Sequence, residues 1–321
     1  MSEPSPNRLR ILLTGKDGQV GWELARALTS LGDVTATSRA ELDLASDASI
    51  RTTVRAVRPH LIVNAAAYTA VDRAENEPQL AQRINADAVA TLAAEAKQIG
   101  AAMIHYSTDY VFDGAKLTLY MEQDATNPLG VYGRTKLAGE QALAEAGIPY
   151  LVLRTSWVYG ARGKNFLRTI LKLAAEKPEL RIVADQTGAP TWSQDIAAAT
   201  LKIAKRWLPE SSGSAAPDKS GIYHLTASGE TTWYGFAEEA IRMYGRISAT
   251  RAKLSHVSPI ASAEYPTPAA RPKNSRLNCA KLAQSFDCRL PDWKASLAAV
   301  LGEIASAETA STEPVATQVT N

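Results

Sequence analysis

The sequence predicts an α/β fold built on a doubly wound parallel sheet. Short apolar runs alternate with segments of helical spacing through the first half of the chain, and the links between them are short. Glycines follow the first apolar run, and a Ser-Thr-Asp sequence follows a later one. Both groups come where strands should end, which is the edge at which open α/β sheets bind ligands.

The composition argues against several kinds of partner. The 321 residues include 35 basic and 33 acidic side chains, a net charge of +2, which gives no support to nucleic-acid binding. No apolar run reaches the roughly 20 residues that span a bilayer, and residues 1–10 lack the apolar stretch of a secretory signal. The two cysteines form no C-x-x-C pair. We expect a cytoplasmic protein with neither a membrane nor a nucleic acid as partner.

The first expected elements are a strand over residues 8–13 and a helix over residues 22–31. Between them lies Thr14-Gly-Lys-Asp-Gly-Gln-Val-Gly21, with the spacing G-x-x-G-x-x-G. Strand, glycine turn and helix are the context of a dinucleotide fingerprint, because glycines let backbone N–H groups approach a pyrophosphate at the helix N-terminus. An ordinary strand-to-helix turn is the alternative. The position of the turn favours a Rossmann-type, NAD(P)-binding domain over residues 8–160.

The second expected strand, residues 33–37, ends at Ser38 and Arg39. A site for NAD would place an acidic residue there, on the ribose 2′-hydroxyl. A hydroxyl and a guanidinium suit a 2′-phosphate instead, so we predict NADPH as the preferred cofactor, with NADH also usable. An ordinary loop arginine is the alternative interpretation. Asp43 and Leu44 follow and should lie near the adenine.

Three further elements lead to the middle of the predicted sheet. Residues 47–58 have helical spacing, with Asp47 as the expected N-cap. A strand over residues 60–64 continues into Ala65-Ala-Ala-Tyr-Thr69, and small residues there let a ligand lie against the backbone. A long helix is expected over residues 78–100.

Polar residues then follow two more predicted strands. The strand over residues 101–106 ends in Ser107-Thr108-Asp109. These side chains should lie near the glycine turn, where Thr108 could hydrogen-bond a carbonyl oxygen of a substrate; turn chemistry is the alternative. Trp157 follows the strand over residues 148–154 at the same edge, and could pack either on a sugar or base or in the core.

Tyr132 and Lys136 lie four residues apart in a segment of helical spacing, after a loop over residues 112–130 that should cover the site. Helical geometry puts them on one face, about 6 Å apart along the axis. An ammonium beside a phenol favours the phenolate and lowers the pKa of the tyrosine, which makes the phenol a better general acid. For this pair alone, a half-exposed tyrosine and a solvated lysine are the alternative.

The second half of the chain is less regular. We assign residues 161–305 mainly to a smaller C-terminal α/β substrate domain. Segments near residues 185–207 and 221–244 should return to the first domain. Residues 306–321, rich in Ala, Ser, Thr and Glu, are expected to form a disordered tail.

These blocks together resemble the extended short-chain dehydrogenase/reductases, and more closely the dTDP-4-dehydrorhamnose reductase family. The resemblance covers about residues 8–304, with the blocks in the family's order. It rests on T-G-x-x-G-x-x-G from Thr14, His105-Tyr-Ser-Thr-Asp-Tyr-Val-Phe112, Tyr132-x-x-x-Lys136, Arg154-Thr-Ser-Trp-Val-Tyr159, Asp185-Gln-Thr-Gly-Ala-Pro-Thr191 and the run Tyr265 to Leu277.

The resemblance implies an oxidoreductase that reduces the C4 keto group of dTDP-4-dehydro-β-L-rhamnose to dTDP-L-rhamnose with NADPH or NADH, as the last step of dTDP-L-rhamnose biosynthesis. It implies that Tyr132 donates the proton, that Lys136 binds the nicotinamide ribose and tunes Tyr132, and that Thr108 contacts the reacting oxygen. The implied cofactor-binding residues are Gly15, Gly18, Gln19, Val20, Ser38, Arg39, Asp43, Leu44, Ala67, Tyr68, Thr69, Tyr132 and Lys136. The implied substrate-binding residues are Thr108, Asp109, Trp157 and Arg271, with Arg271 expected to grip the diphosphate.

One departure from the family concerns magnesium, which some members hold with glutamates at a dimer interface. Gln194 stands where one such glutamate aligns, although Glu303 could supply another carboxylate. The sequence therefore gives a magnesium-bridged dimer little support, and both a monomer and a homodimer stay open. The four histidines show no metal-ligand spacing, so we assign no metal ligand.

Two alternative functions also stay open. The same Thr-Tyr-Lys set would serve a reductase or epimerase of another dTDP-4-keto-6-deoxysugar. The fold family also includes a regulatory subunit that keeps the NADP site as a binding module without catalysis, and fold alone does not decide function.

Overall fold

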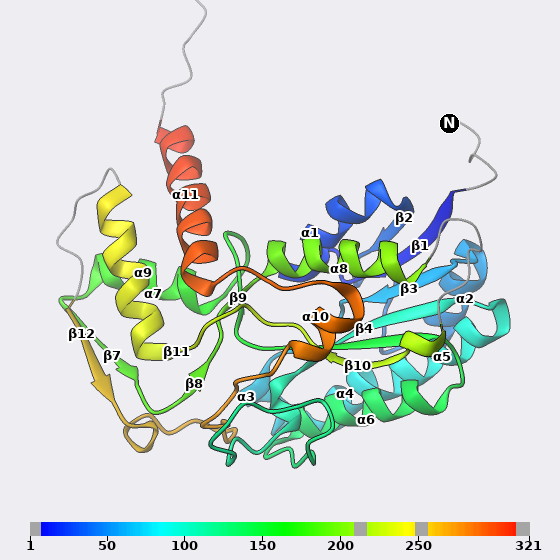
Figure 1. The fold of residues 1–321 in the computed structure, drawn as a ribbon, viewed down its shortest axis with the longest axis horizontal. Helices are drawn as coiled ribbons and strands as arrows, with labels where there is room; N and C mark the ends of the chain where they lie inside the picture. The colour runs from blue at the N-terminus through cyan, green and yellow to red at the C-terminus, as the bar shows by residue number, and fades with distance from the viewer. Residues whose placement is uncertain (1–7, 209–216, 248–255, 313–321) are drawn as a thin grey trace, which may run out of the picture.

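The computed structural model describes residues 8–208, 217–247 and 256–312 (Figure 1). It confirms the α/β class: six parallel strands form one sheet in the order β10-β5-β4-β3-β1-β2. The order reverses at β1, which pairs with β2 on one side and β3 on the other, and such a switch point opens a crevice for a ligand. The strands are β1 (Leu9–Thr14), β2 (Gly32–Thr37), β3 (Leu61–Asn64), β4 (Ala102–Thr108), β5 (Tyr150–Thr155) and β10 (Gly221–His224).

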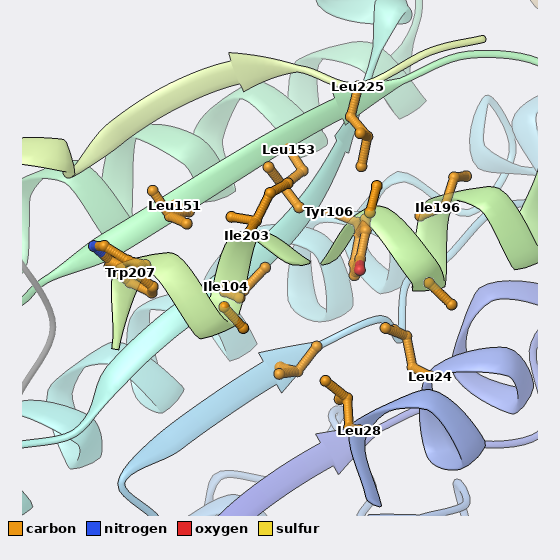
Figure 2. Close-up of a cluster of buried hydrophobic side chains, with 14 of the residues drawn as sticks. Leu24, Leu28, Ile104, Tyr106, Leu151, Leu153, Ile196, Ile203, Trp207 and Leu225 are labelled. Atoms are coloured by element: carbon orange, nitrogen blue, oxygen red, sulfur yellow. The ribbon is translucent and has the colours of Figure 1, made fainter. Parts of the chain in front are cut away.

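Helices cover both faces of this sheet. Successive strand residues point to opposite faces, so Ile11 and Leu13 belong to one buried cluster and Leu12 to the other. The first cluster includes helices α1 (Gln19–Ala27) and α8 (Ser193–Trp207), and Figure 2 shows their side chains, such as Leu24 and Trp207, over the sheet. The helices of the other face are α2 (Asp47–Val57), α5 (Ala88–Ile99) and α6 (Val131–Glu145).

The long helix expected over residues 78–100 is continuous but contains a π-helical turn. α4 (Pro78–Gln82) passes into a π-helical turn at Arg83–Asp87, and α5 follows without a break. A π turn inserts one extra residue into a helix and often occurs at functional sites. The helical periodicity of the sequence does not reveal it.

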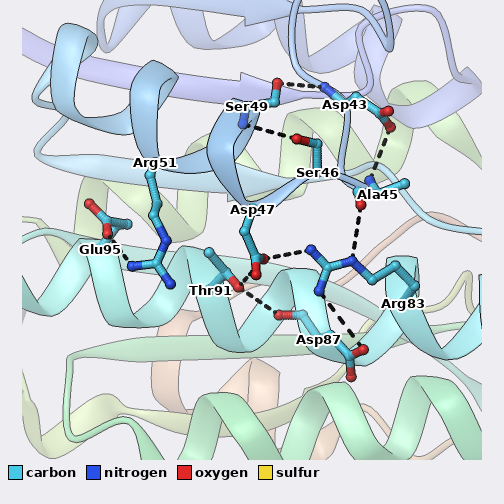
Figure 3. Close-up of polar contacts among 10 residues, drawn as sticks. All are labelled: Asp43, Ala45, Ser46, Asp47, Ser49, Arg51, Arg83, Asp87, Thr91 and Glu95. Atoms are coloured by element: carbon cyan, nitrogen blue, oxygen red, sulfur yellow. Dashed lines mark hydrogen bonds and ion pairs between the residues drawn. The ribbon is translucent and has the colours of Figure 1, made fainter.

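Helix α2 begins one residue away from its expected cap. The Ser46 side chain accepts the N-terminal hydrogen bond from Ser49 N, so Asp47 is not the N-cap. Asp47 instead accepts hydrogen bonds from Arg83 at 2.6 Å and Thr91 at 2.8 Å (Figure 3). The chain after β2 is thereby tied to the π turn.

A second lobe lies beside the sheet, to the left in Figure 1. Its core is formed by helices that pack on one another and on a two-stranded parallel sheet. These elements are α7 (Phe166–Glu176), α9 (Trp233–Ile247), α11 (Trp293–Thr312), β7 (Glu179–Val183) and β12 (His256–Ile260). The remaining elements are β6 (Val158–Tyr159) paired with β9 (Thr191–Trp192), β8 (Thr187–Gly188) paired with β11 (Thr231–Thr232), α3 (Val71–Ala74), α10 (Ala280–Phe286) and 3₁₀ turns at Leu28–Ser30, Asp109–Val111, Pro217–Lys219 and Ser262–Glu264.

The later segments divide between the lobes. Strand β10 joins the main sheet and α8 packs in its core, as expected for segments that return to the first domain. Helix α9 does not return, because Ala240 and Tyr244 pack in the second lobe. The two-domain boundaries drawn from the sequence stay a prediction.

The disordered tail expected from residue 306 is wrong over residues 306–312. Helix α11 continues to Thr312, so residues 306–312 are helical, and residues 313–321 lie outside the described part of the chain. Tyr244 of α9 donates a hydrogen bond to the Glu308 side chain and so ties this extension to the second lobe. Within the described residues, no helix is both long and apolar enough to cross a bilayer.

A buried ion pair makes a testable prediction about this fold. Glu140 on α6 meets Arg154 on β5 at 2.6 Å, and each side chain is only 2% exposed. Glu140→Gln leaves the guanidinium buried without a counter-charge, so we expect the free energy of unfolding in urea to fall by about 3–5 kcal/mol. Glu176→Gln, which breaks the exposed Lys172–Glu176 pair, should cost less than about 0.5 kcal/mol. Equal effects of the two variants would contradict this role for the buried pair.

Candidate active site

A cleft of about 720 Å³ lies at the carboxyl edge of the sheet, beside the switch point. Its walls come from the glycine turn, the end of β2, the chain after β3, and the start of α6. Every residue predicted to bind the cofactor lines it except Lys136, which is buried behind Tyr132 on the same helix. The residues that line it as predicted are Gly15, Gly18, Gln19, Val20, Ser38, Arg39, Asp43, Leu44, Ala67, Tyr68, Thr69 and Tyr132.

The glycine turn is shaped so that only glycine fits at two positions. Gly15 has φ +76°, and a Cβ there would come within 2.9 Å of the Ala66 backbone. A Cβ on Gly21 would lie 1.9 Å from the Gly15 carbonyl oxygen. Helix α1 starts after Gly18 without a side-chain cap, so its first backbone N–H groups can receive an anion.

Tyr132 lies on the cleft with Thr108 as its hydrogen-bonding neighbour. Burial raises the pKa of Tyr132 to about 12, and the bond from Thr108 only partly offsets this. Tyr110 packs edge-on against the Tyr132 ring at 5.5 Å. The net pKa of Tyr132 therefore lies above its ordinary value rather than below it as expected, because desolvation of the phenolate outweighs the groups that favour it.

Lys136 is held by other partners. Its Nζ donates to the Tyr106 carbonyl oxygen at 2.6 Å and lies 3.1 Å from His105 Nε2. Burial lowers the pKa of Lys136 to about 8, against the nearby Glu140 charge, which raises it. The ammonium thus stands behind Tyr132 at a fixed position, where its charge is lost in mildly alkaline solution.

A buried polar row continues from Lys136 across three strands. His105 Nδ1 lies 3.0 Å from Asn64 Nδ2, and Thr14 Oγ1 lies 2.6 Å from Asn64 Oδ1. The strand register places Thr14 opposite Asn64 and Asn64 opposite His105. This row was not predicted from the sequence, although polar residues at the ends of successive apolar strands were its signal.

The charge of Lys136 decides how the row is hydrogen-bonded. An ammonium at Lys136 requires His105 Nε2 to accept, so Nδ1 carries the ring proton and Asn64 must turn its oxygen to the ring. Burial and the Lys136 charge hold the pKa of His105 well below its usual range, so the ring is neutral. The amide orientation is set by this balance of donors and acceptors.

Asn85, in the π turn, is a second residue that sequence analysis missed. Its side chain accepts from Tyr68 N at 2.8 Å and donates to Tyr68 O and to Thr135, each at 3.1 Å. It therefore ties the cleft-lining chain after β3 to helix α6. The extra residue of the π turn is what no helical pattern shows.

Asp109 follows Thr108 and is almost fully buried. Its Oδ1 accepts from Thr108 at 3.1 Å, and Ser275 of the second lobe also hydrogen-bonds it. Its Oδ2 has no hydrogen-bond partner. Burial raises the pKa of Asp109 to about 6, so this carboxylate is costly to keep ionised in the folded protein.

Trp157 packs in an aromatic stack. The centroid of its ring lies 3.6 Å from that of Trp233, and a Cβ on Gly188 would come within 2.6 Å of a Trp157 ring atom. Its backbone has φ +48°, an unusual conformation for a large residue. The ring is half-buried, so it is neither a core residue nor freely exposed, and its contact with a substrate stays a prediction.

Arg271 is also engaged by protein. Its two Nη atoms donate to the Asp72 carboxylate at 2.8 and 3.1 Å, and Asp72 also accepts from Ala269 N. Asp72 belongs to α3 in the first lobe and Arg271 to a loop of the second, so the pair joins the lobes. The proposed grip on a diphosphate would have to share or replace this carboxylate.

Hydrogen bonds hold the loop over residues 112–130 against residues 274–278 of the second lobe. Tyr120 N donates to Arg276 O, and Asn278 N donates to Tyr120 O, each at 2.8 Å. Asn274 donates to the Lys116 and Thr118 carbonyl oxygens. The same stretch carries Ser275, which explains how a distant segment reaches Asp109.

A larger cavity, of about 1340 Å³, lies elsewhere, between α1, α8 and α11. It brings together Glu23, Gln194 and Glu303, with the guanidinium groups of Arg26 and Arg162 over the ring of Trp22. Burial raises the pKa of both glutamates, and the charge of Glu303 raises that of Glu23 further. Among the described residues, no three His, Cys, Asp or Glu side chains could hold a metal ion. The magnesium-bridged dimer stays a prediction.

Comparison with known proteins gives one consistent family. The family model described as the RmlD substrate binding domain matches residues 9–306. The dTDP-4-dehydrorhamnose reductase of Burkholderia thailandensis is 47% identical over 287 residues, which is 89% of this chain and 96% of that protein. The Escherichia coli K12 enzyme of the same name is 47% identical over 92% of this chain and 98% of its own length.

Solved structures agree. The dTDP-4-dehydrorhamnose reductase of Clostridium acetobutylicum has a TM-score of 0.82 at 35% identity, covering 92% of this chain and 99% of that one. The Bacillus anthracis enzyme of the same name, solved in complex with NADP, has a TM-score of 0.82 at 32% identity with the same coverage.

The burial of Asp109 makes a prediction that depends on no ligand. Folding raises the pKa of this carboxyl from 3.8 to about 6. The free energy of unfolding therefore falls as the pH rises through that interval. We expect Asp109→Asn to raise the free energy of unfolding in urea by about 2–3 kcal/mol at pH ~8, and the gain to shrink as the pH falls toward ~5. Exposed Asp218→Asn is the matched control, with an expected change within about 0.5 kcal/mol. A loss of stability at pH ~8, or a gain independent of pH, would refute the argument.

Proposed function

Since the chain belongs to the dTDP-4-dehydrorhamnose reductase family, we propose that it reduces the C4 keto group of dTDP-4-dehydro-β-L-rhamnose with NADPH, giving dTDP-L-rhamnose. The observation that supports the proposal is Tyr132 on the cleft, with Thr108 as its hydrogen-bonding neighbour and Lys136 buried four residues further along the same helix. This is the arrangement that reduction of a ketone requires: an acid, a group to hold the oxygen and a charge to stabilise the spent acid.

The cleft suits a dinucleotide. The uncapped start of α1 and the glycine turn can hold a pyrophosphate, and the Ser38–Arg39 end lies where the adenosine ribose is expected. When bound, the reduced nicotinamide supplies a hydride to the C4 carbon. An NADP-bound relative supports a nicotinamide cofactor, and the preference for NADPH over NADH belongs to the proposal.

Tyr132 then supplies the proton. With a pKa near 12 it is neutral at ordinary pH and can donate its hydroxyl proton to the developing C4 oxyanion. Thr108, whose one hydroxyl hydrogen is donated to Asp109 in this structure, would turn it to the same oxygen. The transfer leaves a phenolate, which the Lys136 ammonium, one helical turn away, stabilises. His105 and the Tyr106 carbonyl oxygen act as positioning groups that hold Lys136 for this role.

The second lobe is proposed to hold the nucleotide sugar. Ser275 reaches Asp109 beside the reacting group, and Arg271, paired with Asp72, offers a guanidinium for the diphosphate. The unpartnered Asp109 Oδ2 can accept from a sugar hydroxyl. This reaction needs no metal ion, because Tyr132 provides the acid.

The alternatives are weaker. A non-catalytic NADP-binding subunit does not need the Thr108, Tyr132 and Lys136 set that this chain places together. A reductase or epimerase of another dTDP-4-keto-6-deoxysugar would use the same set, and the relatives of 47% identity favour the rhamnose substrate. NMR of the product sugar would separate the two by its configuration at C4. A cytoplasmic location, and the choice between monomer and homodimer, stay predictions.

The first functional prediction concerns the proton donor. Tyr132→Phe should lower kcat by about 10²–10⁴-fold while changing the Kd of NADPH by less than about twofold, because it removes one proton and little binding surface. The assay follows NADPH absorbance with dTDP-4-dehydrorhamnose, and NADPH fluorescence gives the Kd. Tyr150→Phe, a half-buried tyrosine outside the cleft, is the matched control. Unchanged turnover in Tyr132→Phe would remove the tyrosine from the mechanism.

The second concerns pH. Lys136 should lose its charge as the pH rises through about 8. The kcat/KM for NADPH, which reports groups of the free enzyme, should then be constant below that pH and fall about tenfold per unit above it. Lys164→Gln removes another ammonium of the cleft and should leave the break point in place. A profile that is flat up to pH ~10 would show that the Lys136 charge is not required.

A further inference from the structure

The end of β2 holds an anion of the protein's own. Glu41 Oε2 accepts from Ser38 N at 2.7 Å and lies 2.5 Å from Lys16 Nζ. The hydrogen bond from Lys16, and then the one from Ser38 N, lowers the pKa of Glu41 to about 2, so the carboxylate is ionised throughout the working range of pH. A backbone N–H and an ammonium that converge on one anion are the donors that a phosphate group would use.

The backbone places both donors beside the cleft. Gly15 N and Lys16 N both donate to Thr37 O, at 2.9 and 3.1 Å, which ties the glycine turn to the end of β2. Ser38 lines the cleft next in the chain. Leu42 N donates to Ser38 O and closes the turn that carries Glu41 back over Ser38. All of these contacts are made within residues 15–42, so they do not depend on the second lobe.

Arg39, which the sequence suggested as the phosphate ligand, is less engaged. Its side chain is 78% exposed and lies 4.0 Å from Asp43. Lys16, which sequence analysis did not assign, is the cation that is held in place, with 33% of its side chain exposed. Glu41 holds it. This glutamate lies three positions after Ser38, which stands where an NAD site carries its acidic residue.

We propose that the Glu41 carboxylate occupies the place of the cofactor's 2′-phosphate and sets the choice between NADPH and NADH. The inference rests on the proposed function, which supplies a dinucleotide for this cleft. With NADH, the ribose 2′-hydroxyl donates to Glu41, as it does to the acidic residue of an NAD site. With NADPH, the phosphate must displace Glu41 from Lys16 and Ser38 N, so one anion replaces another.

The exchange explains why neither cofactor is excluded. Glu41 is 52% exposed on a surface turn, so it can move into solvent without disturbing the core. The phosphate then gains Lys16 and Ser38 N but breaks an existing ion pair, so its net advantage is smaller than the contacts alone suggest. Removing the competing carboxylate should turn a mild preference for NADPH into a strong one.

The test compares Glu41→Gln with the wild-type chain by calorimetry. The probes are adenosine 2′,5′-bisphosphate, which carries the 2′-phosphate, and 5′-AMP, which lacks it. Glu41→Gln should bind the bisphosphate about two- to fivefold more tightly and 5′-AMP equally or more weakly, since an exposed ion pair is worth about that factor. The ratio of kcat/KM for NADPH to that for NADH should rise by a similar factor. Lys16→Gln should lower the ratio.

Asp33→Asn is the matched control, because it removes one negative charge at the opposite end of β2, where Asp33 pairs with Arg8. It should leave the ratio of bisphosphate to 5′-AMP affinity unchanged. The inference fails if Glu41→Gln shifts that ratio no more than Asp33→Asn, while both probes still bind. If the wild-type chain binds neither probe, the proposed cofactor itself is wrong and the inference falls with it.

Discussion

The need to bury one lysine charge shapes much of this structure. Lys136 is only 2% exposed, so its ammonium depends on the Tyr106 carbonyl oxygen and a neutral His105. Glu140, four residues further along α6, favours the charge, and Arg154 in turn neutralises Glu140. One face of α6 thus carries Tyr132, Lys136 and Glu140 at successive turns. The strands of the sheet supply the partners that hold Lys136 and Glu140 in place.

Parallel register extends this constraint across the sheet. Thr14, Asn64 and His105 stand opposite one another because β1, β3 and β4 pair in register, so the glycine turn and Lys136 share one hydrogen-bonded row. A shift of one strand by one residue would turn its polar residue to the wrong face. The cleft is therefore positioned by the same pairing that forms the core.

Much of the first lobe was predictable, because its signals are local. Alternating apolar runs, the glycine turn and a tyrosine–lysine spacing of four fix strands, turn and helix without reference to distant residues. What was missed depends on tertiary structure: the π turn that orients Asn85, the burial that raises the pKa of Tyr132, and the pairing of Arg271 with Asp72. The helical residues 306–312 were misjudged from composition, because the hydrogen bond from Tyr244 of α9 to Glu308 is a tertiary contact that composition does not show.

The place of β10 has a consequence for how the chain can be divided. This edge strand and helix α8 come from beyond residue 160, yet they complete the main sheet and its core. A fragment ending at residue 160 would leave β5 as an unpaired edge and expose the apolar residues that α8 covers, which favours aggregation. The lobes are thus interleaved rather than modular, so a cut at residue 160 cannot separate them without removing part of the main sheet and its core.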